Sequence, residues 1–178
     1  MSTENSPQSL TSLSYLPYLD EEGCILTDLQ GKIGVYAIFN QEKEMQYVGY
    51  SRDVYLSLKQ HLVRQPQNCY WFKVQTITRP SRQILEEIAN SWIEENGTTP
   101  IGNQANSVWT EPIDTNSAMT EEEKAQYQQS DELGQIKIRK KVARRIEAEI
   151  QKQLSDRSVG MEIRFNPKLK EKGLLDLK

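Results

Sequence analysis

Residues 31–62, GKIGVYAIFNQEKEMQYVGYSRDVYLSLKQHL, carry the clearest structural pattern of this 178-residue chain. Its apolar run at 33–39 is rich in β-branched and aromatic side chains, which predicts a buried strand. A polar turn at 40–44 and a second short strand at 45–49 follow, and together they predict a β-hairpin. After the hairpin, Asp53 is placed to cap a helix whose apolar side chains recur every four residues.

The residues that follow extend this hairpin into a small domain. Alternating side chains at 69–77 predict a third strand, and Ser81 is placed to cap a second helix that reaches Glu95. Asn96 and Gly97 then form a good helix stop. We therefore expect an α+β fold with a small three-stranded mixed or antiparallel sheet flanked by helices, followed by a helical C-terminal extension.

Composition excludes several classes of protein. The net charge of −3 and the pI of about 5.4 argue against a chain whose main task is non-specific nucleic-acid binding, which needs a basic field. Two cysteines in unrelated segments and a single histidine exclude a disulfide framework and a multi-histidine metal site. No apolar run reaches membrane-spanning length and the N-terminus lacks a signal pattern, so we expect a cytoplasmic protein without a membrane span.

Shifts in composition predict the domain organisation. The polar residues 1–14 predict a disordered N-terminus, and residues 15–105 carry the α+β domain. A polar linker is expected at 106–119, with Trp109 as an anchor that packs back on the domain. Residues 120–178 are expected to form a helical extension and a tail.

The extension is dominated by one long predicted helix. Thr120 opens a capping box, Gly134 is expected to interrupt the helix that starts there, and a stronger helix is predicted at about 135–155. That helix has a single apolar seam, which needs a covering surface from the same domain or from another chain. Its basic first half, with Arg144 and Arg145, is a candidate contact for phosphates, and a solvated helix face is the alternative.

Two tripeptides of the hairpin resemble the signature of the GIY-YIG nuclease family. They are Gly34-Val35-Tyr36 and Tyr47-Val48-Gly49, separated by the hairpin loop that the family has there. The helix opened by Asp53 is similar to the family's segment after the second tripeptide, and Asn103 resembles the asparagine that closes the domain. The resemblance covers residues 30–105 and implies the small α+β fold of this family.

The resemblance also implies a set of catalytic positions. Tyr36 and Tyr47 would face one site and help to activate a water for attack on a phosphodiester, and His61 matches a histidine of some members. The arginine that neutralises charge on the phosphate falls on Ser57. The glutamate that binds a divalent metal falls on Ala89.

Two charged groups of the family pattern are therefore replaced. Serine lacks the fixed positive fork of a guanidinium, and alanine offers no oxygen ligand to magnesium. Glu86, three residues before Ala89 on the same helical face, is the candidate substitute metal ligand. Arg52, Lys59 and Arg64 are candidate substitutes for the contact with nucleic-acid phosphate.

These residues are compatible with three functions. We expect a degenerate, non-catalytic domain that binds nucleic acid or a protein partner and needs no cofactor. The alternative is an active endonuclease that hydrolyses DNA phosphodiester bonds with Mg²⁺, as the family resemblance implies. The third is a structural or assembly subunit of a larger complex, in which the C-terminal helix and tail supply the protein contacts.

Overall fold

The computed structural model describes residues 6–104 and 107–178 of the chain. The chain divides into two compact units, Met1–Thr110 and Glu111–Lys178, which we call unit 1 and unit 2. The predicted domain boundary at 105–106 and the first five residues of the predicted disordered N-terminus lie outside the described residues.

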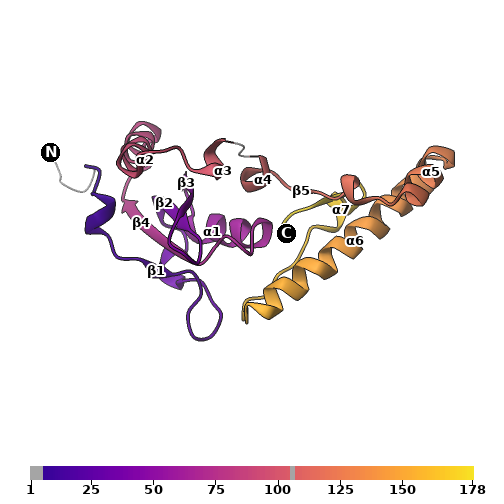
Figure 1. Ribbon diagram of the computed structural model, residues 1–178, viewed down its shortest axis with the longest axis horizontal. Coiled ribbons are helices and arrows are strands. Elements are labelled where there is room, and N and C mark those ends of the chain that lie inside the picture. The colour runs from indigo at the N-terminus through magenta and orange to yellow at the C-terminus, as the bar shows by residue number, and fades with distance from the viewer. Residues whose placement is uncertain (1–5, 105–106) are drawn as a thin grey trace. The chain divides into compact units, whose positions relative to one another are not determined.

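A four-stranded antiparallel sheet with the order β1-β4-β2-β3 forms the centre of unit 1 (Figure 1). The expected hairpin is β2 and β3, and the third predicted strand is β4. The sequence does not predict β1, whose Leu16 pairs with Phe72 and whose Pro17 pairs with Trp71. The α+β class is confirmed, but the expected number of three strands is wrong, because this short proline-containing edge strand has no alternating pattern. The strands are β1 Leu16–Pro17, β2 Ile33–Phe39, β3 Met45–Ser51 and β4 Trp71–Ile77.

Side-chain caps start the two long helices of unit 1. Asp53 accepts a hydrogen bond from the Leu56 amide at 3.2 Å, and Ser81 accepts one from the Ile84 amide at 3.3 Å, as the sequence predicts. Gly97 ends the second helix with a φ of 87°, which glycine adopts without strain. The helices described in unit 1 are η2 Leu10–Ser12, η3 Thr27–Leu29, α1 Val54–Arg64, α2 Arg82–Asn96, α3 Ile101–Gln104 and α4 Ser107–Thr110.

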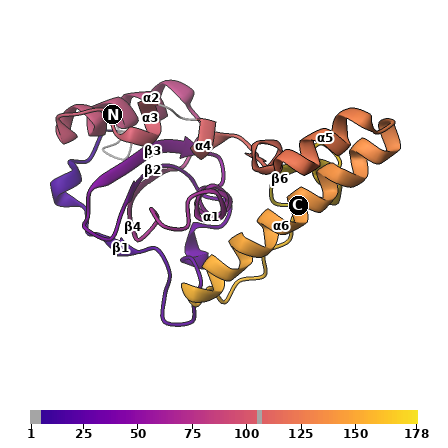
Figure 2. The same ribbon diagram turned by 45° about the vertical axis from the view of Figure 1, so that its right-hand side comes forward.

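The helices α1 and α2 cover opposite faces of this sheet (Figure 2). On the α2 side, Val35 and Ala37 of β2 pack with Trp92 in the hydrophobic core. Successive side chains of a strand point to opposite faces, so Tyr36 and Tyr47 lie on the side of α1. One face of the sheet is therefore a plain apolar core, and the other holds the signature tyrosines.

Residues 6–14 pack against the rest of unit 1, although the sequence predicts disorder there. Leu10 is buried, and its amide donates a hydrogen bond to the Glu95 carboxylate at 2.7 Å. The amide of Gln8 donates to the Gln75 side chain at 2.9 Å. Because α2 and β4 supply these partners from distant parts of the chain, local composition gives no sign of them.

Unit 2 is built around the long helix α6, Glu132–Asp156. The predicted capping box is present, since the Thr120 amide donates to Glu123 at 2.9 Å and the Glu123 amide donates to Thr120 at 3.1 Å. Asp131 caps α6 by accepting from the Gly134 amide at 2.8 Å. The preceding helix, α5 Glu121–Gln129, therefore ends before Gly134, and Gly134 lies inside α6. The other elements described in unit 2 are β5 Ile113–Asp114, η4 Asn116–Ala118, α5 Glu121–Gln129, α7 Pro167–Lys170 and β6 Leu174–Leu175.

A two-stranded sheet connects the two ends of the sequence of unit 2. Ile113 in β5 pairs with Leu175 in β6, and the buried Thr115 hydroxyl donates to the Gly173 carbonyl at 2.7 Å. Residues 107–119, predicted as a polar linker, therefore contain α4, β5 and η4. Over the described residues, none of the helices combines the length and hydrophobicity needed to cross a membrane.

Candidate functional site

Four side chains of unit 1 form an aromatic–histidine cluster: Tyr36 of β2, Tyr47 of β3, His61 of α1 and Trp109 of α4. The Tyr36 hydroxyl is hydrogen-bonded to Nε2 of His61 at 2.8 Å. The ring centroids of the two tyrosines are 6.3 Å apart, and that of His61 lies 4.8 Å from that of Tyr47. The structure thus brings together the three residues that the family resemblance singles out.

The register of the hairpin explains why the two tyrosines meet. Tyr36 pairs with Gly49 and Ile38 pairs with Tyr47, so the tyrosines are diagonal neighbours on one face. A Cβ atom on Gly49 would lie 2.6 Å from Cε1 of Tyr47 and 2.9 Å from the Tyr36 hydroxyl. At Gly34, a Cβ atom would lie 2.6 Å from a backbone oxygen of β4. The glycines of both tripeptides are therefore required by close packing.

Trp109 covers this cluster. Its indole ring stacks on Tyr47 with an interplanar angle of 4° and a centroid separation of 5.4 Å, and the side chain is 3 % exposed. Trp109 packs directly against the backbone of Gly102, because a Cβ atom at that position would lie only 2.9 Å from the indole. Nη1 of Arg64 donates to the Trp109 carbonyl at 3.0 Å. Trp109 thus packs back on unit 1, as the sequence predicts, and it does so on the signature tyrosine itself.

Burial keeps the ionisable members of the cluster neutral. Burial raises the pKa of Tyr36 far above its usual value, and burial also raises the pKa of Tyr47. Burial, with a smaller effect of the Arg64 charge, lowers the pKa of His61 to about 3. At neutral pH the cluster therefore contains two phenols and an uncharged imidazole.

The two replaced family positions provide no charge at this cluster. The Ser57 hydroxyl donates a hydrogen bond to Ser51 Oγ at 2.7 Å. Ala89 is 8 % exposed and belongs to the apolar core on the α2 side of the sheet, with Val35 and Trp92. A carboxylate at position 89 would therefore enter an apolar environment in this structure.

The structure does not bring Glu86 to the cluster. Its carboxylate accepts hydrogen bonds from Nε of Arg82 at 2.7 Å and from the Tyr50 hydroxyl at 3.2 Å. Tyr50 pairs with Val35, so it belongs to the face opposite Tyr36 and Tyr47. The hydrogen bond from Arg82 lowers the pKa of Glu86 and keeps it ionised.

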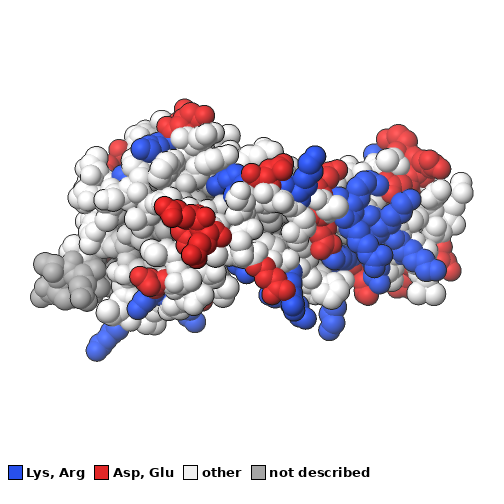
Figure 3. All heavy atoms as spheres, turned by 90° about the horizontal axis from the view of Figure 1, so that it is seen from below, with Lys and Arg blue, Asp and Glu red and all other residues white. Residues whose placement is uncertain are grey.

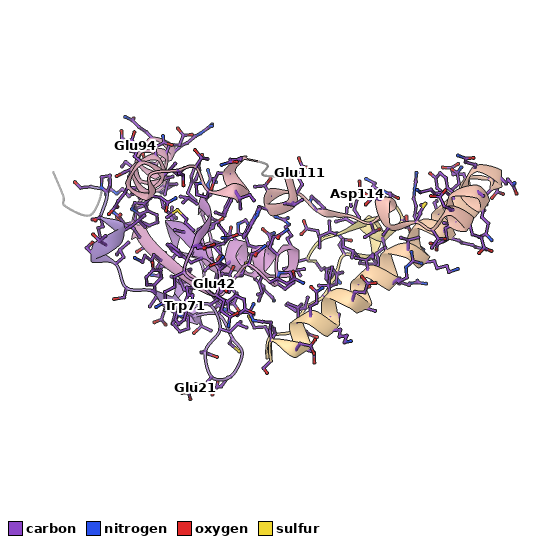
Figure 4. The ribbon with its side chains drawn as sticks, viewed as in Figure 1. Glu21, Glu42, Trp71, Glu94, Glu111 and Asp114 are labelled. Carbon is purple, nitrogen blue, oxygen red and sulfur yellow. The ribbon has the colours of Figure 1, made fainter. Side chains whose placement is uncertain are left out.

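Acidic residues in the described part of unit 1 are spread over several of its elements. Figure 4 shows Glu21 on the loop after β1, Glu42 on the β2–β3 turn and Glu94 on α2. Across the two described ranges, no three His, Cys, Asp or Glu side chains come together as a metal site would require. Within the same residues, no carboxylate is hydrogen-bonded to any of the four side chains of the cluster.

The three basic candidates of unit 1 have different surroundings. Arg64 lies next to the cluster and is held by the Trp109 carbonyl. Arg52 is exposed and lines a hollow of about 410 Å³ with Tyr50 and Arg82, on the side of α2. Lys59 is half-buried on α1. The positive charge of Arg64 partly offsets the rise that burial causes in the pKa values of Tyr36 and Tyr47.

The two basic candidates of unit 2, Arg144 and Arg145, also have different surroundings. Arg145 donates to the Glu123 carboxylate at 2.9 and 3.1 Å and to the Ala118 carbonyl at 2.8 Å. It therefore holds α5 and α6 together, and its guanidinium is used inside the unit. Arg144 is exposed and makes no ion pair with a described residue.

Asn103 closes unit 1 as the resemblance implies. Its side chain accepts from the Val48 amide at 2.9 Å and donates to the Val48 carbonyl at 2.8 Å. These two bonds satisfy backbone groups of β3, the edge strand of the sheet. They also fix α3 beside β3, one residue after Gly102, against which Trp109 packs.

Comparison with known proteins gives one distant relative. No family model matches the chain. The chain is 31 % identical over 102 residues to the bifunctional monothiol glutaredoxin-S16, chloroplastic, of Arabidopsis thaliana, an alignment over 55 % of the chain and 33 % of that protein. The part of this relative outside its glutaredoxin is GIY-YIG-like. The chain thus spans about a third of the relative's length, and the likeness supports a GIY-YIG-like superfamily link without a specific function. Our expectation of a cytoplasmic location stays a prediction, because the relative is named as a chloroplast protein.

Proposed function

We propose that unit 1 is a GIY-YIG-type domain that has lost phosphodiester hydrolysis and acts as a binding module for nucleic acid or a protein partner. The observation that carries this proposal is the position of Trp109, stacked over Tyr47 where a substrate would have to approach the tyrosines. The likeness to a GIY-YIG-like region of a known protein supports the assignment of the domain type.

The chemistry of the cluster supports the loss of hydrolysis. Attack on a phosphodiester needs an activated water and positive charge where the phosphate gains negative charge. A phenol with a raised pKa and an imidazole with a pKa of about 3 are both poor bases at neutral pH. Ser57 carries no charge, and the nearby Arg64 is bonded to the Trp109 carbonyl.

The donor set also fits Mg²⁺ poorly. This ion prefers oxygen ligands in octahedral geometry, with at least one carboxylate from the protein. Ala89 supplies none, and Glu86 is paired with Arg82 on the other side of the sheet. We therefore assign no cofactor to the domain.

An active endonuclease that uses Mg²⁺ is the second candidate. The hydrogen bond between Tyr36 and His61, with Tyr47 beside it, is the observation that favours it, since the family-like groups remain in contact. The third candidate is a structural or assembly subunit, which would use the C-terminal helix and tail for its protein contacts.

A cleavage assay separates the first two candidates. The pure protein is incubated with branched, nicked and single-stranded DNA in Mg²⁺ or Mn²⁺. We expect no cleavage by the wild type, and none by Trp109→Ala, which uncovers the tyrosines without adding a charged group. Cleavage that is lost in Tyr36→Phe but kept in the control Tyr50→Phe, whose hydroxyl lies outside the cluster, would overturn the proposal in favour of the endonuclease.

A further inference from the structure

The first half of α6 carries an unusual density of positive charge. Residues 137–145 contain six Lys and Arg and no acidic residue. The structure shows that some of these cations are used inside unit 2. Arg145 is bonded to Glu123, Arg139 contacts the ring and the hydroxyl of Tyr127, and Lys140 lies 3.6 Å from Glu171.

The remaining cations point to solvent on one side of the helix. Lys137, Lys141 and Arg144 are exposed, and their spacing of four and three residues places them on one helical face. None of the three forms an ion pair with a residue in the described part of unit 2. Figure 3 shows Lys and Arg side chains gathered over the first half of this helix.

A second segment adds to this charge. Exposed Lys168 of α7 lines a hollow of about 300 Å³ with Arg144, Lys140 and Lys170, and the one carboxylate in its lining, that of Glu171, is paired with Lys140. The ion pair between Lys170 and Glu147 of α6, at 2.5 Å, holds α7 in place. We call Lys137, Lys141, Arg144 and Lys168 the basic face of unit 2. It is contributed by two segments that the fold brings together.

We propose that the basic face of unit 2 binds the phosphate backbone of a nucleic acid. From residue 137 to 144, α6 rises about 10 Å, whereas duplex DNA carries one negative charge per about 1.7 Å of its axis. The face therefore meets several phosphates at once. This inference rests on the binding role proposed above and selects nucleic acid as the partner, with unit 2 as the contact.

The surroundings of the face argue against a membrane as the partner. A helix that lies on a membrane needs large apolar side chains next to its basic residues. In the described part of unit 2, Leu133 is the one large apolar side chain that is strongly exposed.

The charge distribution agrees with a polyanion that binds at unit 2. Unit 1 contains 8 basic and 12 acidic residues, and unit 2 contains 14 and 13.

The test measures the binding of a labelled short DNA duplex to the full chain by fluorescence anisotropy at several salt concentrations. Each phosphate contact contributes a slope of about −0.9 to a plot of log affinity against log salt concentration, so four contacts lower the affinity about 100-fold between about 50 and 200 mM. In the variant with Lys137, Lys141, Arg144 and Lys168 all changed to Gln, we expect the slope to fall close to zero.

A matched control removes the same charge elsewhere. The control variant changes the exposed Lys32, Arg79, Lys152 and Lys178 to Gln, and we expect it to keep the wild-type slope. If circular dichroism shows that the variant of the basic face is misfolded, the single change Arg144→Gln replaces it. That change should reduce the slope by about one contact, or about 0.9.

Three results would overturn the proposal. They are no binding at the lowest salt, an equal loss of binding in both four-residue variants, or tighter binding to phosphatidylglycerol vesicles or to a poly-glutamate peptide than to the duplex. None of these results affects the cleavage assay, so a failure here is distinguishable from a failure of the function proposed for unit 1.

Discussion

The two units of this protein bury ionisable side chains in opposite ways. In unit 1, Tyr36 and His61 are buried and held neutral, with pKa values moved by burial itself. In unit 2, Glu123 is buried and held charged, because hydrogen bonds from Arg145 lower its pKa to about 2. The difference shows that burial favours the neutral form where no countercharge is supplied, and that a bonded guanidinium reverses this preference.

The two units also differ in the charged groups that they offer for function. Hydrolysis in unit 1 would need ionic groups at the tyrosines, but the structure places a stacked indole there. Unit 2 has more cations than its internal ion pairs use, and the excess forms the basic face.

The largest effect is expected at the cover of the cluster. Trp109→Ala should destabilise unit 1 by about 3 to 5 kcal/mol, because a buried indole is lost and a cavity remains. Urea unfolding followed by tryptophan fluorescence measures this, since all three tryptophans of the chain lie in unit 1. The neighbouring Val108→Ala is the control, because Val108 is 57 % exposed and its change should have little effect. Equal losses in both variants would contradict the covering role of Trp109.

The stability of unit 1 should depend on pH through the protonation of His61. Its folded pKa of about 3 lies below the usual value of 6.5, so stability is full above pH 6.5 and falls as the unfolded state takes up the proton. Between pH 6.5 and 4.5 we expect a loss of about 2 to 3 kcal/mol, measured by the urea midpoint of tryptophan fluorescence.

This pH window isolates a single group. His61 is the only histidine of the chain, and carboxylates with lowered pKa values change stability at lower pH. The stability of His61→Gln should therefore be nearly constant from pH 6.5 to 4.5. A wild-type midpoint that is constant over the same range would show that His61 is protonated in the folded protein.

A smaller effect is expected at the ion pair of unit 2. Glu123→Gln should destabilise the helices of unit 2 by about 1 to 2 kcal/mol, since the Glu123 side chain is 7 % exposed but solvent screens Arg145, which is 38 % exposed. Far-UV circular dichroism follows this loss, and the exposed Glu122→Gln is the control.

Lowering the pH should remove the stabilisation that the ion pair of Glu123 and Arg145 provides. The pKa of Glu123 is about 2 in the folded protein against 4.5 ordinarily, so its stabilisation is present above pH 4.5 and is lost as the pH falls toward 2. If Glu123→Gln leaves the acid unfolding of unit 2 unchanged, the pair with Arg145 is not what holds α5 against α6.

The smallest effect is expected at Glu86. Glu86→Gln removes an exposed pair with Arg82 and should leave the urea midpoint of unit 1 unchanged. Titration with Mg²⁺ should also give no stabilisation of the wild type. Stabilisation by Mg²⁺ that disappears in Glu86→Gln would show that this carboxylate is a metal ligand after all.

Much of unit 1 could be predicted from its sequence. The hairpin and the Asp53 and Ser81 caps follow from spacing and from local hydrogen bonding, whereas the shared site of Tyr36 and Tyr47 is what the family resemblance implies. The proximity of His61 follows from the family resemblance. The stacking of Trp109 on Tyr47 could not be predicted, because 62 residues of sequence separate the two rings.

In unit 2 the sequence was less informative. The capping box at Thr120 is local, and its prediction is confirmed. Arg144 and Arg145 look equivalent in the sequence, yet Arg145 is bonded to Glu123 and Arg144 is exposed. Their different uses depend on where α5 packs against α6.

The order of residues was enough to indicate the hairpin and the helices that Asp53, Ser81 and Thr120 open, because alternation and capping depend on neighbouring backbone geometry. Which ionisable groups lose water and which gain a partner became known only from the packing of the folded units. Desolvation and ion pairing depend on groups that are distant in the chain, and these two effects set whether a tyrosine, a histidine or an arginine is available for chemistry or for binding.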